Sequence, residues 1–185
     1  MTARKVPIVA TLVVAAAIAT MVWLGFWQLD RLEQKEAMLA RYAQAQTSGQ
    51  VLAALPADPL NNLYHRTPFT CSTVSGWNAI AGRNDRDQTG YIHIAQCPGA
   101  DVVIGWSPGP DQPEWQGGPI TGTIAPGGIA GWRIVADPPL AGLQANAVPD
   151  PATIPNNHLA YAVQWFLFAL VALVIYILAL RRRAR

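Results

Sequence analysis

Two stretches without a single His, Lys, Arg, Asp or Glu decide how this chain folds. They are residues 6–27, VPIVATLVVAAAIATMVWLGFW, and residues 159–180, LAYAVQWFLFALVALVIYILAL. Each is 22 residues long. A helix of that length spans roughly 33 Å, which is enough to cross the hydrocarbon core of a bilayer. Because lipid offers no hydrogen-bond partner to a free backbone, both stretches are predicted to be transmembrane helices.

The first stretch has a second interpretation, a cleaved signal peptide. Arg4 and Lys5 precede the apolar run, and the Ala-Ile-Ala at 17–19 resembles a cleavage site. The apolar run continues beyond that point to Trp27, which favours an uncleaved anchor. Trp23 and Trp27 at one end of the run fit the aromatic belt found at membrane interfaces.

The charges are strongly segregated along the chain. The formal net charge is only +2, from 13 Lys and Arg against 11 Asp and Glu. Residues 28–158 hold all 11 acids and seven of the positive groups, a net of −4, and the two tails hold the other six positive groups. Cytoplasmic segments are rich in Lys and Arg, so both termini are predicted to be cytoplasmic and residues 28–158 periplasmic. The expected location is a bacterial inner membrane, and no nucleic-acid partner is expected.

These features divide the chain into six segments. Good helix formers without Gly or Pro continue the first span outward until Ser48 and Gly49 end the helix. The expected segments are a cytoplasmic tail (1–5), a transmembrane helix (6–27), a juxtamembrane helix (28–50), an external β-rich domain (51–158), a transmembrane helix (159–180) and a cytoplasmic tail (181–185).

The amino-acid composition changes in the external domain. Residues 56–155 hold 14 of the 15 Pro and 13 of the 15 Gly, a density that breaks helices. Short β-prone runs lie between these breakers, at 68–74, 77–81, 91–95, 102–106, 120–124 and 132–135. The predicted fold class is therefore a membrane protein of α+β type, with two transmembrane helices flanking a small, mostly antiparallel sheet, sandwich or barrel.

The external domain offers little for catalysis. It has no phosphate-binding loop, dinucleotide motif or nucleophile elbow, so no enzymatic activity is expected. Cys71 and Cys97 are its two cysteines. Outside the cytoplasm they are expected to form a disulfide or to remain as buried thiols. A copper or thiol-redox pair is the alternative, although no CxxC motif and no Met or His cluster supports it.

His158 stands out because it immediately precedes the second apolar stretch, where a neutral imidazole can ligate a metal such as haem iron. Tyr161 and Trp165 follow three and seven residues later on the same helical face, and Gln164 places an amide within the apolar run. An intramembrane amide usually faces a partner helix or a site. The alternative is a plain helix start, with Asn156 or Asn157 as the N-cap and His158 at the interface.

Four segments resemble the surfeit locus protein 1 family, which are assembly factors for haem–copper cytochrome c oxidase. Residues 24–35, LGFWQLDRLEQK, are similar to the family pattern LGxWQxxRxxxK, and residues 157–166, NHLAYAVQWF, are similar to NHLxYAxxWF. Between them, LYHR at 63–66 resembles LxYR, and GWSP at 105–108 resembles GWxP. The family commonly has an Arg before the GW pair, whereas Ile104 stands there in this chain.

The resemblance implies a membrane-anchored, non-enzymatic assembly factor that aids insertion of haem a into the catalytic subunit of the oxidase, with haem a synthase as a second partner. By position, His158 is the candidate ligand of the haem iron, with Trp27, Tyr161, Gln164 and Trp165 lining the site. Arg31 is expected to pair with a haem propionate, or else to contact lipid headgroups or an acid on its own helix. A permanent structural subunit of a respiratory complex is the alternative function, followed by a copper or thiol-redox protein using Cys71 and Cys97.

Overall fold

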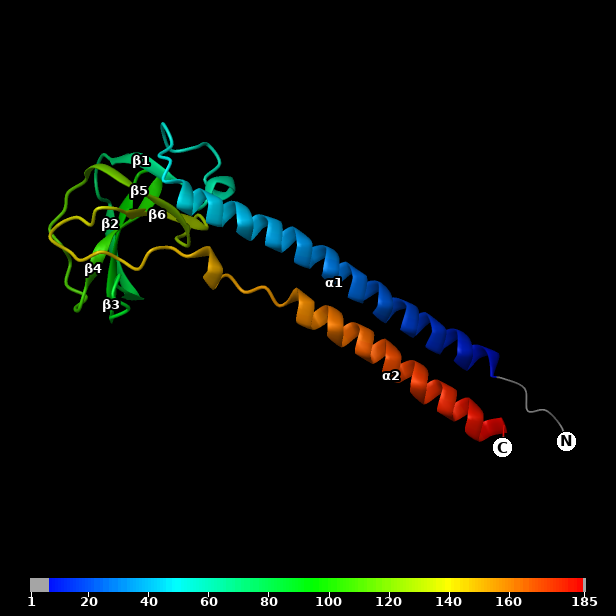
Figure 1. The fold of residues 1–185 in the computed structure, drawn as a ribbon. Coiled ribbons are helices and arrows are strands. Elements are labelled where there is room, and N and C mark those ends of the chain that lie inside the picture. Colours follow the sequence, from blue (N-terminus) through cyan, green and yellow to red (C-terminus); the bar gives the residue numbers. More distant parts are fainter. Residues whose placement is uncertain (1–6, 185) are drawn as a thin grey trace. The chain divides into compact units, whose positions relative to one another are not determined.

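The computed structural model describes residues 7–184, so the expected tail at 1–5, together with Val6 and Arg185, lies outside the described residues. The chain divides into two compact units. A helical unit combines the residues up to Met38 with those from Pro155 onward, and a β-sheet unit comprises Leu39–Ile154. Figure 1 shows the order of the elements along the chain.

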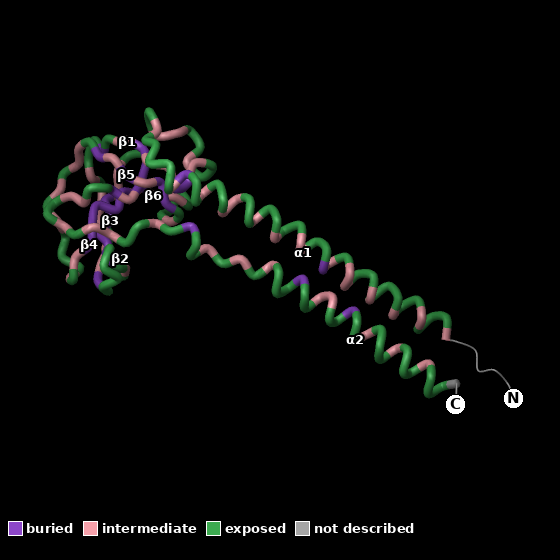
Figure 2. Tube along the Cα trace, in the orientation of Figure 1, coloured by how far each residue is buried: buried purple, intermediate pink, exposed green. Residues whose placement is uncertain are grey.

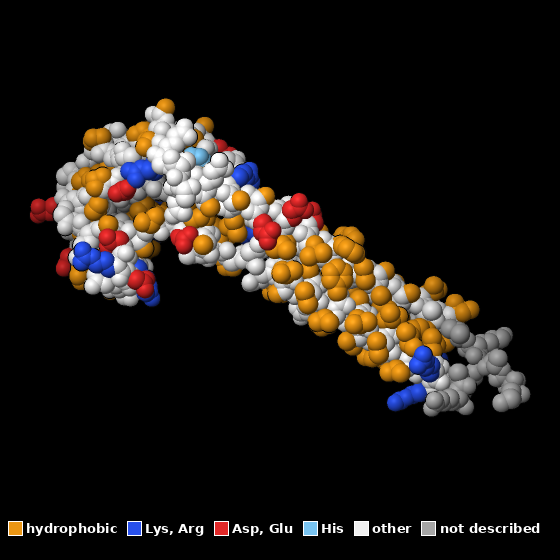
Figure 3. All heavy atoms as spheres, viewed as in Figure 1, with side chains coloured by type: hydrophobic (Ala, Val, Ile, Leu, Met, Phe, Trp, Pro, Cys, Tyr) orange, Lys and Arg blue, Asp and Glu red, His pale blue; other side chains and the backbone are white. Residues whose placement is uncertain are grey.

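The helical unit contains two long helices. Helix α1 is Ile8–Ser48, whose last turns from Leu39 belong to the β-sheet unit, and helix α2 is His158–Ala184. Both are long and apolar enough to cross a membrane. Most of their side chains are exposed (Figure 2), and apolar groups cover much of the surface of both (Figure 3). Such a surface suits lipid rather than water, as the sequence predicted.

Six strands form a single sheet with the order β1-β5-β6-β4-β3-β2. They are β1 (Arg66–Cys71), β2 (Gly76–Arg83), β3 (Thr89–Cys97), β4 (Ala100–Ser107), β5 (Gly118–Pro126) and β6 (Trp132–Ala136). Each corresponds to one of the six expected runs, with its ends shifted by a few residues. All neighbouring pairs are antiparallel except β4 and β6, which are parallel. The expected α+β class, with a mostly antiparallel sheet between two apolar helices, is confirmed.

A disulfide shows that the sheet is strongly curved. Cys71 at the end of β1 and Cys97 at the end of β3 are bonded, and their Cα atoms are 5.4 Å apart. Three strands separate β1 from β3 in the sheet order. A flat sheet would place these two strands about 19 Å apart, four interstrand spacings. The sheet therefore bends until the ends of β1 and β3 meet. Of the alternatives that the sequence left open for the two cysteines, the structure has the disulfide.

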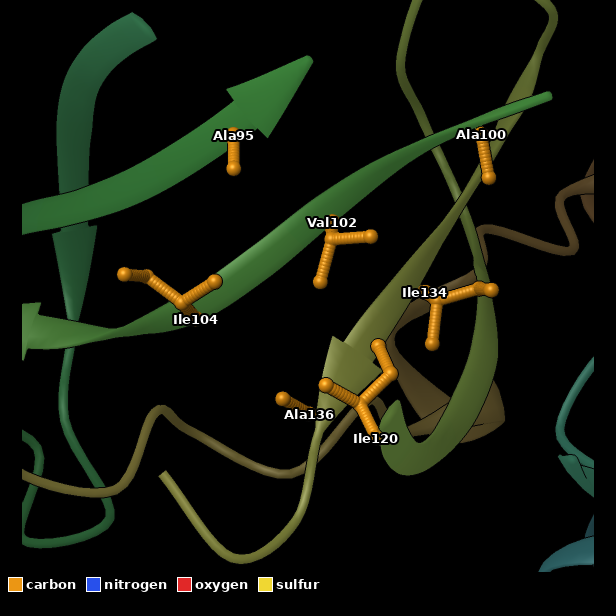
Figure 4. Packing of buried hydrophobic residues seen from close by; sticks show 7 residues of the cluster. All are labelled: Ala95, Ala100, Val102, Ile104, Ile120, Ile134 and Ala136. Carbon is orange, nitrogen blue, oxygen red and sulfur yellow. The ribbon is translucent and has the colours of Figure 1, made fainter. Parts of the chain in front are cut away.

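The main core covers one face of this sheet. Figure 4 shows side chains from β3, β4, β5 and β6 meeting on that face, namely Ala95, Ala100, Val102, Ile104, Ile120, Ile134 and Ala136. A smaller cluster on the opposite face contains Ile92, Ile94, Val103 and Trp106. Strand β4 is thus buried on both faces. This explains why its sequence, ADVVIGWS, lacks the alternation of a half-exposed strand.

His93 on β3 is a buried polar residue, with 1% of its surface exposed. Its Nε2 lies 2.7 Å from the Ser107 hydroxyl, which itself donates to the Gly109 carbonyl at 2.7 Å. The single hydroxyl proton is thereby used, so Nε2–H of His93 is the donor to Ser107. Burial lowers the pKa of His93 below its ordinary value, and the Gly109 backbone and the charge of Asp111 partly oppose this shift.

Acid is therefore expected to destabilise the wild type more than a His93→Gln variant. A histidine in the unfolded chain titrates near pH 6.5, while the folded protein takes up this proton only at lower pH. The free energy of unfolding then falls as the pH drops below about 6.5, by at most about 1.4 kcal/mol per pH unit for one proton. Urea unfolding of both proteins between about pH 7.5 and 5.5 measures this. A difference between them that does not change with pH would contradict the prediction.

Candidate functional site

Helices α1 and α2 run antiparallel and contact each other along one seam. Thr11 shares a hydrogen bond with Tyr176, and Gln28 shares one with His158. The first turns of α1 therefore lie beside the last turns of α2, and the middle of α1 lies beside the start of α2. The half-buried and buried residues recur every three or four positions on both helices, including Thr11, Val14, Ile18, Met21, Gly25, Gln28 and Leu32 on α1 and His158, Ala162, Trp165, Ala169, Ala172 and Tyr176 on α2. This spacing is typical of left-handed helix packing in soluble and membrane proteins.

His158 lies at the first residue of α2 and is held by Gln28. The imidazole Nδ1 is 2.7 Å from Gln28 Oε1. An amide oxygen can only accept, so Nδ1 carries the proton and Nε2 keeps a free lone pair. A hydrogen bond to one ring nitrogen is the usual way in which a protein orients a metal-ligating histidine. With Nδ1 bonded to Gln28, Nε2 of a neutral His158 is the ring nitrogen left to bind a metal.

Sequence reasoning missed Gln28. It placed residue 28 in the first end motif and at the start of the juxtamembrane helix, and it named no partner for His158 on the other helix. The signal that could have found it is the presence of Gln28 in one motif and His158 in the other, because both motifs end at the same predicted membrane boundary.

The alternative interpretation of His158 as part of a simple helix cap has less support. Asn157 precedes the helix, and its backbone carbonyl accepts from the Tyr161 N–H at 3.2 Å. Within residues 7–184, neither Asn156 nor Asn157 makes a side-chain capping bond, and Asn156 Oδ1 is buried without a partner. The imidazole of His158 is bonded across the seam instead.

Close packing supports the seam beside this pair. Gly25 is buried one turn from Gln28, and a Cβ atom there would lie 2.6 Å from the ring of Phe166. Phe166 also contacts Phe26 edge to face, with ring centroids 5.4 Å apart. Ala162, with 1% of its surface exposed, fills the corresponding position on α2. Small residues let the two helices approach closely enough for Gln28 to reach His158.

Arg31 is placed one turn beyond Gln28 and has no acidic partner among the described residues. Its guanidinium lies over the Trp27 ring, 5.6 Å from the centroid, and Nη1 donates to Gln34 Oε1 at 2.8 Å. Gln34 in turn donates to Asp30 at 2.8 Å. The expected alternative of a salt bridge within α1 is therefore not formed, and the positive charge stays available to an anionic group.

The remaining candidates lie on one flank of the helix pair. Residues advance by about 100° around a helix, so Arg31 and Trp27 lie about 60° and 100° to one side of Gln28. On the antiparallel partner, Tyr161 and Gln164 lie about 60° and 120° from His158, on that same side of the pair. Tyr161 is 51% exposed and Trp27 40% exposed, Gln164 is exposed rather than buried against α1, and Trp165 is half-buried next to the seam.

The side chains on this flank have the chemistry to contact a flat apolar molecule that carries a metal and acidic groups. Aromatic side chains supply an apolar wall, His158 Nε2 supplies a lone pair, and Arg31 supplies a positive charge without a carboxylate partner. Those donors fit the requirements of haem, which is an apolar macrocycle with an iron centre and two propionates.

The two middle motifs lie in the β-sheet unit and have structural roles there. Tyr64 is 2% exposed and adopts a left-handed backbone conformation with φ of 68°. Trp106 is 2% exposed, and its indole N–H donates to the Gly82 carbonyl at 3.3 Å. Ile104, at the position where the family commonly has Arg, is fully buried in the main core. That position has no room for an unpaired charge.

Comparison with known protein families gives one match. The model of the SURF1 family matches residues 15–170, which include both end motifs and the whole β-sheet unit. Among curated proteins, none matches the chain significantly. A match over most of the chain, with the end motifs joined across the seam by Gln28 and His158, shows that the chain is a membrane protein of the SURF1 family, a family of cytochrome c oxidase assembly factors rather than of enzymes.

Proposed function

We propose that the chain carries haem a during its insertion into the catalytic subunit of cytochrome c oxidase, with haem a synthase as the source, and that His158 binds the iron through Nε2. The observation that supports this most directly is the 2.7 Å hydrogen bond from His158 Nδ1 to Gln28, which fixes the ring and leaves Nε2 as a base. Haem a is cargo in this proposal, and the protein performs no covalent chemistry on it.

The other residues of the flank have distinct parts in this proposal. Trp27, Tyr161 and Trp165 contact the apolar macrocycle, and Arg31 pairs with a propionate, a charge-assisted contact that specifies the carboxylate edge. Gln164 offers an amide to a polar substituent or to a helix of the catalytic subunit.

The proposed location follows from the charges along the chain. Three arginines in the last turn of α2 and the acidic excess of residues 28–158 favour a bacterial inner membrane with cytoplasmic termini. His158 then lies at the periplasmic membrane surface.

The binding test is the absorption spectrum of the protein purified from cells that make haem a. We expect a haem spectrum for the wild type, loss of it in His158→Ala, and weaker retention in Gln28→Ala, because removing the hydrogen-bond partner of a metal ligand costs about 10- to 100-fold in affinity. His65→Ala is the matched control, since His65 belongs to the β-sheet unit. Haem retained unchanged in His158→Ala, or no haem in the wild type, would disprove the role of His158.

The assembly role is tested separately in a deletion strain. Without the protein, the oxidase is expected to have less haem a and less activity, and the wild-type gene restores both. His158→Ala should fail to restore the haem a content. A strain without the protein but with normal oxidase would exclude an assembly role. Retention in stoichiometric amounts with the mature oxidase would favour a permanent subunit instead.

A further inference from the structure

A cavity of about 290 Å³ lies on the face of the sheet opposite the main core, entirely within the β-sheet unit. The segment 144–153 crosses this face and is fixed to it by the backbone bond from Ala147 N to the Arg83 carbonyl, 3.0 Å. The walls from the sheet are mainly apolar and include Ile80, Ile92, Val103, Ala125 and Val135. An apolar cavity with a few polar groups is the usual form of a small-molecule site.

Two polar side chains that line this cavity have buried atoms without a hydrogen-bond partner among residues 7–184. Nε of Arg133 on β6 is buried and unpaired, and so are both amide atoms of Asn146 in the crossing segment. Buried polar groups in native proteins are nearly always paired, so three unpaired atoms on two side chains that line one cavity require an explanation.

The acids near Arg133 do not neutralise it. Asp150 lines the same cavity, but its carboxylate accepts from the Ala152 N–H at 2.8 Å. Asp101 accepts from the Ile129 N–H at 3.3 Å. Neither forms an ion pair with Arg133. Burial lowers the pKa of Arg133, and the charge of Asp101 opposes this shift only in part. No carboxylate among the described residues forms an ion pair with the guanidinium.

Arginine can bind a carboxylate side-on through Nε–H and one terminal N–H, and Nε–H of Arg133 has no partner among the described residues. We propose that this cavity binds an apolar monocarboxylate, such as a fatty acid of medium chain length. The carboxylate pairs with Arg133, and Asn146 donates a further hydrogen bond to it. The alkyl chain lies on Ile80, Ile92 and Val103. The cavity volume is at the lower end of the range for small-molecule sites, which favours a single short chain over a macrocycle.

Octanoate is the probe, added to the full-length protein in lipid nanodiscs, and the midpoint of thermal unfolding of the β-sheet unit is the measurement. Octanol tests the chain without the carboxylate, and butanoate tests the carboxylate without the chain. We expect octanoate to raise the midpoint in a saturable way and the other two compounds to have little effect. Because both octanoate and octanol enter lipid, an unspecific membrane effect would appear with octanol as well.

Two variants locate the binding. Arg133→Met removes the charge and the donors while keeping an unbranched apolar side chain, and we expect octanoate binding to weaken at least tenfold. Ala125 on β5 pairs with Arg133 on β6 in the strand register. Ala125→Leu keeps every polar group but fills the cavity beside Arg133, and it should weaken binding similarly. Arg41→Met is the matched control, because Arg41 is an exposed cation that does not line this cavity.

Equal octanoate binding by Arg133→Met and the wild type would overturn the proposal, as would an octanol effect as large as that of octanoate. Failure of Arg133→Met to fold leaves Ala125→Leu to decide, since it retains the arginine. Because no residue of this cavity belongs to the helical unit, these results are independent of the haem proposal.

Discussion

A Gly25→Leu substitution is expected to separate α1 from α2 and to abolish haem retention. The Cβ atom alone would lie 2.6 Å from the Phe166 ring, and a leucine adds three more carbon atoms in a buried part of the seam. Overpacking of a well-packed contact costs about 1–3 kcal/mol. Two helices in lipid have little hydrophobic drive to stay together, so a loss of that size is enough to shift them apart. Gln28 then no longer reaches His158.

The separation can be measured in the chain with Thr11→Cys and Tyr176→Cys, two positions whose side chains are hydrogen-bonded across the seam. We expect the yield of the cross-link that a short thiol-reactive bifunctional reagent forms between them, quantified by mass spectrometry, to fall by about tenfold when Gly25→Leu is added. Haem retention should fall in parallel in the chain with its native residues at 11 and 176.

Two controls distinguish a clash from a general defect. Gly25→Ala should have a small effect, because the ring of Phe166 can rotate away from one methyl group. Phe166→Ala should restore pairing in the Gly25→Leu background, because it removes the atoms that clash; the double-mutant cycle gives the coupling between the two positions. If Gly25→Leu cross-links as well as the parent, the seam does not depend on this contact.

Replacing Cys71 and Cys97 by alanine is expected to destabilise the β-sheet unit by about 3.5 kcal/mol, the chain-entropy value for a loop closed by residues about 26 apart. The bond joins the ends of β1 and β3, which lie three strands apart in the sheet order. Without it, only the non-covalent contacts of the curved sheet bring these ends together. The effect is large for a unit of this size, because small domains are marginally stable.

Urea unfolding of the full-length protein, followed by tryptophan fluorescence, measures this loss. Cys97→Ala alone should lose about as much as the double variant, since either one removes the same bond. Reductant should lower the stability of the wild type and leave the double variant unchanged. A loss below about 1 kcal/mol would mean that the closed form of the sheet is held without the disulfide. Normal assembly of the oxidase with the double variant would exclude a copper or thiol-redox function.

Local sequence patterns determined the elements of this fold. Charge-free runs of 22 residues predicted both apolar helices, because only a helix can satisfy its backbone in lipid. Pro and Gly residues separate six β-prone runs, and all six runs form strands. The membrane boundary within α1, expected at Trp27, stays a prediction. The roles of His158, Trp27, Arg31, Tyr161, Gln164 and Trp165 likewise stay predictions.

Contacts between distant residues were beyond the sequence. Nothing local indicates that β4 pairs in parallel with β6, that the sheet bends until Cys71 meets Cys97, or that Arg133 faces a cavity. The partner of His158 was missed for the same reason, because Gln28 lies 130 residues away.

The sequence by itself therefore determined the two helices, the six strands and the position of His158 at the start of α2, because hydrophobic runs and helix breakers act over a few neighbouring residues. Only the tertiary structure decided that Gln28 holds the imidazole, that Arg31 has no acidic partner within the described part of the chain, and that the cysteines are bonded. Each of these depends on how close two segments come in space.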